Sequence, residues 1–166
     1  MEEINKEEMI NSVSTLVNEI LTYMDKDSEV IEAYLLGVVK EADSIFDIIS
    51  SYQERFTRDE VNPVDFYYSA MDRLTGCYMY LCPVVTVVAA LISKQSLKYY
   101  QLKKLEVIDK GEKFVATSTD KESSYYVANM KMTFSVLEGF LNSCLQGIQT
   151  CRRRVASTKE EEGLAR

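Results

Sequence analysis

The stretch that decides the fold is residues 127–155, VANMKMTFSVLEGFLNSCLQGIQTCRRRV. Its apolar side chains recur at alternating intervals of three and four residues, so they share one face of a single helix. The nine positions on this face are Val127, Met130, Phe134, Leu137, Leu141, Cys144, Ile148, Cys151 and Val155. A stripe this long and narrow suits a helix that packs lengthwise against other helices. The sequence therefore predicts an all-α protein, a bundle of long heptad-patterned helices that forms a coiled-coil-like oligomer.

The same spacing continues through the rest of the chain and divides it into three parts. Residues 1–60 are expected to form an acidic N-terminal helical hairpin, whose second helix runs unbroken to Phe56. Residues 61–157 form a long-helix core, and residues 158–166 form a charged tail that we expect to be frayed.

The first helix of the core is expected over residues 63–110. Asn62-Pro63 marks its start, because a capping residue precedes a proline at the first helical position. Pro83 either ends or kinks this helix, and a kink is favoured because the apolar period resumes at once. Gly111 is a good C-terminal stop.

The second helix of the core is expected over residues 119–157. Thr119 and Glu122 have the spacing of a capping box, in which two side chains satisfy the first free backbone N–H groups of a helix. No run of residues outside a helical period favours a strand.

Composition argues against an enzyme. The chain contains no histidine, which is the commonest general base and the commonest metal ligand. It also lacks a glycine-rich phosphate loop and other catalytic motifs. We therefore expect no catalytic residues, no cofactor and no metal site. The four cysteines form no C-x-x-C pair, which argues against zinc and favours a reducing compartment; they are Cys77, Cys82, Cys144 and Cys151.

The N-terminus is acidic and polar, without the pattern of a secretory signal. The longest apolar run, Leu81 to Ile92, has about a dozen residues, fewer than the roughly 20 that span a bilayer. We interpret it as part of a buried helix and expect no membrane partner. The expected location is the cytoplasm of a bacterial or phage-infected cell.

Charge is divided unevenly along the chain. The net charge of −7 is the difference between 26 acids and 19 bases. Residues 1–72 hold 17 acids against 5 bases, whereas residues 73–166 hold 14 bases against 9 acids. Such asymmetry is typical of a basic working surface beside an acidic one, but ordinary solvated helix faces also produce it.

A basic segment with interleaved aromatics is the strongest candidate for ligand binding. Its candidate residues are Lys94, Lys98, Tyr99, Tyr100, Lys103, Lys104 and Lys110. Lysines that neutralise phosphates, beside aromatics on which bases stack, are the ingredients of sequence-independent single-strand binding. Around a helix these lysines do not form one stripe, so an ordinary polar surface is the alternative interpretation.

Arg152, Arg153 and Arg154 form a second basic group. Cations near a helix C-terminus interact favourably with the helix dipole without any ligand. The same three side chains are also suited to phosphate contacts.

The layout from Pro63 to Val155 resembles the UvsY-type recombination mediators of T-even-like phages. The resemblance lies in the order of features. A tyrosine- and leucine-rich helix part (67–81) precedes a segment that is basic in its second half and ends at Gly111. A short polar connection leads to Thr119-Asp120, and a final helix, with Cys144 and Gly147, ends in the arginines.

This resemblance implies an all-α protein without catalytic activity that assembles into a ring and binds single-stranded DNA. It also implies partners, a RecA-like recombinase that the protein helps to load onto strands covered by single-strand-binding protein. The family's DNA contacts would correspond to Lys103, and to Lys104 and Lys110 by extension. Ile108-Asp109 stands where the family has an aromatic pair, and residues 1–60 have no counterpart in the resemblance.

Two functions from different classes follow. The first is a recombination mediator that binds single-stranded DNA without sequence preference through the lysines, tyrosines and arginines named above. The alternative is a structural or assembly protein, such as a scaffold or virion component, whose helices bind only protein. An inhibitor that captures another protein through the acidic hairpin is a third possibility.

Overall fold

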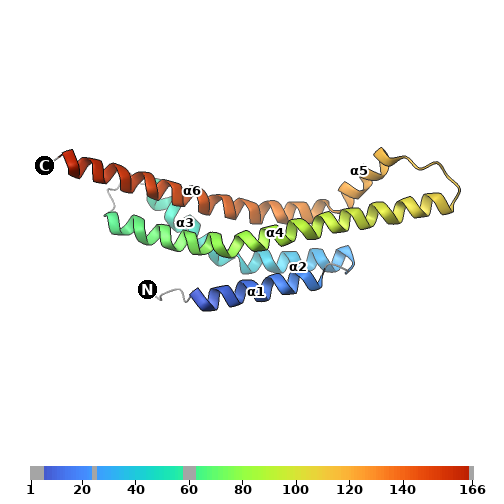
Figure 1. Cartoon of the computed structure of the whole chain (residues 1–166), viewed down its shortest axis with the longest axis horizontal. Coiled ribbons are helices and arrows are strands. Elements are labelled where there is room, and N and C mark those ends of the chain that lie inside the picture. Colours follow the sequence, from blue (N-terminus) through green and yellow to red (C-terminus); the bar gives the residue numbers. More distant parts are fainter. Residues whose placement is uncertain (1–5, 24–25, 58–62, 165–166) are drawn as a thin grey trace. The chain divides into compact units, whose positions relative to one another are not determined.

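The computed structural model describes residues 6–23, 26–57 and 63–164, and these contain six helices and no strand. The predicted all-α fold is confirmed. The helices, in chain order, are α1 (Lys6–Thr22), α2 (Ser28–Glu41), α3 (Asp43–Thr57), α4 (Val64–Asp109), α5 (Ala116–Tyr126) and α6 (Ala128–Leu164) (Figure 1).

Two compact units make up the chain, and both are assembled from distant segments. Unit 1 contains Met1–Val39 and Pro83–Val136, and unit 2 contains Lys40–Cys82 and Leu137–Arg166. This division does not follow the predicted one at residue 60. The helices α4 and α6 each contribute to both units, and the acidic N-terminal segment is divided between the units after Val39.

Unit 1 holds the α1–α2 hairpin, the second half of α4, α5 and the start of α6. Tyr23 and Tyr34 stack across the hairpin with ring centroids 4.0 Å apart, as expected for antiparallel neighbours. The core residue Gln95 is fully buried, and its Nε2 donates a hydrogen bond to the carbonyl of Lys26 at 3.4 Å. A polar residue that interrupts the apolar stripe of α4 therefore ties α4 to the end of the hairpin.

The helix α4 runs through Pro83 without ending, as the resumed apolar period predicts. It ends at Asp109, and two residues later Gly111 has a φ of 68°, in the left-handed region that favours glycine. The N–H of Glu112 bonds to the carbonyl of Val107, and that of Gly111 bonds to Ile108. These two bonds form a Schellman cap, so the predicted stop is confirmed. Asn62, the predicted start, lies outside the described residues, and Pro63 directly precedes the helix.

Among the described helices, α4 alone is long and apolar enough to cross a membrane by length and composition. Its most apolar 18-residue window has a mean hydropathy of 1.9, and 39% of this window is buried inside the protein.

Unit 2 packs the first half of α4 against α6, with α3 alongside. The helices α4 and α6 run antiparallel (Figure 1), and a Cβ atom added at Gly147 would lie 2.7 Å from Cδ1 of Leu74. The fully buried Leu74 therefore occupies the space that a side chain at position 147 would need. We call this contact the Leu74–Gly147 seam. Four rings of α3 and α4, Tyr52, Phe56, Phe66 and Tyr67, pack together at the end of unit 2 that holds the start of α4.

The predicted stripe of α6 is largely in the core. Seven of its nine members are buried, and Phe134 and Leu141 are half-buried. Heptad spacing thus identifies the packed face of α6 correctly.

Three predicted helix boundaries are wrong. The second helix breaks at Ala42 into α2 and α3, and the N–H groups of Ile45 and Phe46 bond to the Ala42 carbonyl where the new helix begins. The last helix divides at Val127 into α5 and α6. The tail is also helical as far as Leu164 rather than frayed.

The predicted capping box does not form either. The α5 N-cap is Val115, without a side-chain cap. The Thr119 hydroxyl instead donates to the Val115 carbonyl at 3.2 Å, one turn back within the helix. Its partner Glu122 accepts a hydrogen bond from Ser118 at 3.2 Å.

The seam predicts opposite effects for one substitution at two glycines of α6. We expect Gly147→Val to lower the free energy of unfolding by roughly 1–3 kcal/mol, because the new side chain overpacks against Leu74. Gly139 has no atom within 4 Å of an added Cβ. Gly139→Val is therefore expected to raise that free energy by a few tenths of a kcal/mol, since valine is the better helix former. Guanidinium unfolding followed by circular dichroism measures both, and equal effects at the two positions would contradict a tight seam.

Candidate nucleic-acid interface

The predicted binding residues fall into two groups in different units. The five lysines and two tyrosines lie on or directly after the second half of α4, in unit 1. The three arginines lie on α6, in unit 2. The two groups are therefore separate surfaces, a lysine–tyrosine surface on unit 1 and an arginine surface on unit 2.

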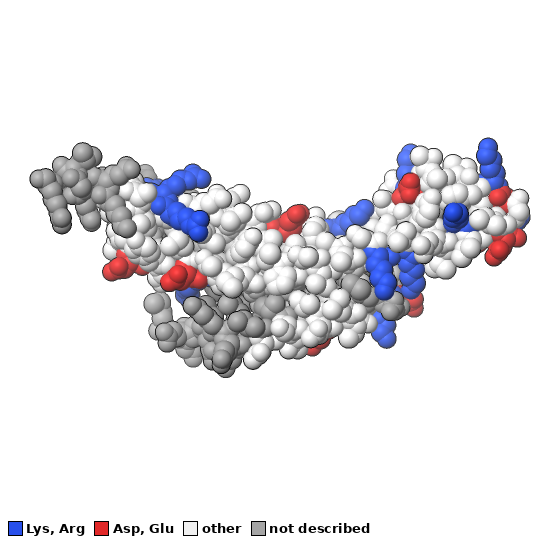
Figure 2. Space-filling model, viewed as in Figure 1, with Lys and Arg blue, Asp and Glu red and all other residues white. Residues whose placement is uncertain are grey.

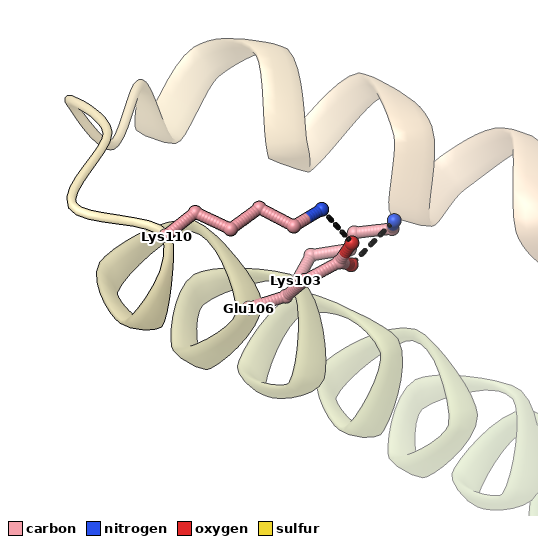
Figure 3. A network of polar contacts seen from close by, with 3 residues as sticks. All are labelled: Lys103, Glu106 and Lys110. Atoms are coloured by element: carbon pink, nitrogen blue, oxygen red, sulfur yellow. Dashed lines mark hydrogen bonds and ion pairs between the residues drawn. The ribbon is translucent and has the colours of Figure 1, made fainter.

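Two of the lysines are held by a single carboxylate. Lys103 and Lys110 converge on Glu106 from both sides, with Nζ to carboxylate oxygen distances of 2.7 and 2.6 Å (Figure 3). Hydrogen bonds from the two ammonium groups lower the pKa of Glu106 to about 2. The hydrogen bond to Glu106 likewise raises the pKa of Lys103. This cluster has two positive charges and one negative charge, so it presents one net positive charge to a ligand.

The two tyrosines make contacts within the protein. Tyr99 stacks on Tyr126 at the end of α5, with ring centroids 4.5 Å apart. Tyr100 meets the ring of Phe114 edge-on at 5.7 Å, and the Nζ of Lys104 lies 5.9 Å from the same ring. Tyr99 is therefore engaged in holding α5 against α4, whereas Tyr100 is half-buried and keeps one side in a groove described below.

The spacing of the lysines predicts that they do not form one stripe along α4, and the structure agrees. Lys94 and Lys98 are one turn apart and share a side of α4. Lys103 lies on the side that carries Glu106 and Lys110. Figure 2 shows basic and acidic side chains interleaved where α4 ends and α5 begins. The face of unit 1 shown in Figure 2 therefore has no continuous basic track.

The arginine group is more open. Arg152, Arg153 and Arg154 are all exposed on α6. The helix continues to Leu164 and its last turn carries no basic residue, so the explanation from the helix dipole is wrong. Phosphate contact remains the prediction for these residues.

A groove in unit 1 brings together residues that the sequence does not group. It has a volume of about 450 Å³ and lies between α4, α5 and the start of α6. Its lining residues are Ile92, Ser93, Ser96, Leu97, Tyr100, Asp120, Ser123 and Lys131. One aromatic ring, three serine hydroxyls, one carboxylate, one ammonium group and two aliphatic side chains thus surround a space that is open to solvent.

Sequence reasoning missed most of these residues. Ser93 and Ser96 are small polar positions three residues apart in an apolar helix, which is a signal that marks one face of α4. Ser96 and Ser123 are hydrogen-bonded through their Oγ atoms at 3.4 Å. No pattern marks Lys131, because only the break at Val127 places it beside the groove. The part of the chain that the structure describes holds no group of three or more acidic or cysteine residues that could bind a metal ion.

The chain matches no protein-family model, no curated protein and no solved structure.

The lysine–glutamate cluster predicts an unusual titration. Glu106 should titrate near pH 2, and changing both Lys103 and Lys110 to alanine should return its pKa to an ordinary value near about 4.3. Because the folded pKa is the lower one, the stabilising effect of the cluster is complete above the unfolded pKa. It is lost as the pH falls through about 2.

The carboxyl ¹³C shift of Glu106 followed against pH measures this directly. Lys113→Ala is the matched control, because Lys113 is exposed and lies outside the cluster. An unchanged Glu106 pKa in the double variant would contradict the ion pairs.

Proposed function

We propose that the protein is a non-enzymatic, self-associating recombination mediator that binds single-stranded DNA without sequence preference and helps to load a recombinase. The groove of unit 1 is the observation that carries this proposal. Tyr100 offers a ring on which a base can stack, and Lys131 offers a cation for the adjoining phosphate. The serine hydroxyls donate their protons within the protein, to Ala89, Ser123 and Asp120 respectively, and their oxygens can accept hydrogen bonds from base N–H groups.

The order of elements also supports the proposal. A long helix, a glycine stop, a short connection and a final helical region follow one another as α4, Gly111, residues 112–115 and α5–α6. This is the order on which the resemblance to UvsY-type mediators rests. The interruption at Val127 adds a feature that the resemblance does not include.

The remaining basic residues supply positive charge near the groove of unit 1 or on the arginine surface of unit 2. Lys94, Lys98 and Lys104 lie on the helix that forms one wall of the groove. Arg152 to Arg154 would contact a strand as three neighbouring cations on unit 2. A mediator of this kind would act in the cytoplasm with a RecA-like recombinase and single-strand-binding protein, and its ring would contain several copies of the chain.

Binding to a labelled single-stranded oligonucleotide tests the proposal. We expect the affinity measured by fluorescence anisotropy to fall steeply with salt, because each neutralised phosphate releases counterions. Tyr100→Leu should weaken binding by about 1–3 kcal/mol, the usual value of one base–aromatic stack. Lys131→Ala should weaken it and make the log–log salt slope shallower by about 0.7, one phosphate contact to a single strand.

Lys121→Ala is the matched control for Lys131→Ala, because Lys121 is an exposed lysine of α5 that does not line the groove. Equal losses for the two lysine variants would show that net charge, not the groove, determines binding. No binding at low salt would overturn the mediator function.

A structural or assembly function is the second candidate, and exposed apolar side chains of α4 support it. Leu102, Leu105 and Ile108 are each more than half exposed and are spaced three residues apart. They therefore lie on one side of the helix and leave apolar area uncovered. A protein that binds only other helices would use this surface and would need no nucleic acid.

Charge inserted into this surface tests self-association. We expect Leu102→Glu with Leu105→Glu to shift the sedimentation coefficient toward the monomer, since burying two carboxylates against a partner helix is costly. Leu36→Glu is the control, because Leu36 is a leucine of α2 with similar exposure. Assembly without DNA binding would favour the structural function, and unchanged assembly of the double variant would exclude this surface.

A further inference from the structure

Two cysteines face each other across the contact between α4 and α6. Cys77 lies one turn after Leu74 on α4, and Cys144 lies one turn before Gly147 on α6. Because the helices are antiparallel, the register that brings Leu74 onto Gly147 also brings Cys77 opposite Cys144. The two thiols are hydrogen-bonded to each other, and both are buried. The absence of a side chain at position 147 keeps the two helices close at this point.

The two thiols are chemically unequal. The hydrogen bond from Cys144 and the positive charge of Arg73 lower the pKa of Cys77, against the opposing effect of burial. The same hydrogen bond and burial raise the pKa of Cys144. A thiolate is the reactive form of cysteine, so Cys77 is the better nucleophile of the pair. Cys144 is placed to react second.

We propose that Cys77 and Cys144 are a peroxide-sensitive pair that forms a reversible disulfide between α4 and α6. Hydrogen peroxide is the oxidant, and its small size suits a buried pair. The Cys77 thiolate attacks one peroxide oxygen, the O–O bond breaks, and the departing hydroxide takes up a proton as water. The sulfenic acid on Cys77 is then attacked by the Cys144 sulfur, which forms the S–S bond and releases a second water. In total two thiols lose two electrons and two protons, and one peroxide becomes two waters.

The position of this bond in the chain gives it a structural effect. Residues 83–136, which belong to unit 1, lie between the two cysteines, and both cysteines belong to unit 2. The disulfide therefore joins α4 where the chain leaves unit 2 to α6 where it returns. Cross-links that close a long loop restrict the unfolded chain most strongly, so the oxidised protein should resist unfolding better than the reduced protein. A thiol reductant would reverse the effect by thiol–disulfide exchange.

Peroxide treatment of the reduced, purified full chain tests the proposal. We expect an intact mass lower by two hydrogens and a proteolytic peptide pair joined through Cys77 and Cys144. The guanidinium midpoint of unfolding should rise, and dithiothreitol should return it to the starting value. In Cys144→Ser, whose hydroxyl keeps a hydrogen-bond donor beside Cys77, a sulfenic acid should persist on Cys77 and be trapped by dimedone. Cys77→Ala should lose both the disulfide and the dimedone adduct.

Cys151→Ala is the matched control, because Cys151 is as fully buried as Cys144 and lies on the same helix and stripe. It should fold with the same helicity by circular dichroism and still form the disulfide. Cys82→Ala should also leave the reaction unchanged. First oxidation at Cys82 or Cys151, or a midpoint that peroxide does not raise while the four thiols disappear, would overturn the proposal.

Discussion

The close contact of α4 with α6 at Leu74 and Gly147 is the constraint on which the structure of unit 2 depends. A glycine in the middle of a helix costs about 1 kcal/mol in helix propensity, and this cost is offset because the missing side chain admits a buried leucine. The same register buries Cys144 and Cys151 on the α6 stripe and places Cys77 opposite Cys144. One small residue therefore determines both the packing distance of the two helices and the chemistry that their facing thiols can undergo.

Unit 1 depends on a different device, the interruption of helix at Val127. The backbone of Val127 departs from helical geometry, with φ of −101° and ψ of 13°, and the side chain of Val127 is fully buried. This break lets α5 return along α4, where Tyr126 stacks on Tyr99 and Ser123 bonds to Ser96. The groove lies between α4 and α5 and includes Lys131, which lies just after the break. Had the predicted helix over 119–157 been continuous, these residues would have no reason to meet.

The features of the fold that the sequence predicts are those determined by interactions within a few helical turns. The apolar stripe of α6, the stop at Gly111 and the passage through Pro83 were predictable, because periodicity and backbone conformational limits act within a few turns. The breaks at Ala42 and Val127 were not predictable. The apolar period continues across Ala42, and residues 119–126 carry no apolar stripe whose end would mark a break at Val127. Among the site residues, the separation of Lys103 from Lys98 followed from helix geometry. The packing of Tyr99 on Tyr126 and the position of Lys131 depend on tertiary contacts.

The acidity of the whole chain does not decide whether it can bind a polyanion. Electrostatic interactions between exposed charges are largely screened beyond about 8 Å at physiological salt, so the charges within that distance of a bound strand matter more than the net charge of the chain. Near the groove, Lys131 is accompanied by Asp120, and the two ion pairs of Glu106 hold Lys103 and Lys110. A phosphate that approaches this cluster must compete with a carboxylate already bonded to both lysines. Any affinity of unit 1 for a strand would therefore depend more on stacking at Tyr100 than on phosphate neutralisation. The exposed arginines of unit 2, for which no acidic partner is seen among the described contacts, would contribute the larger electrostatic share.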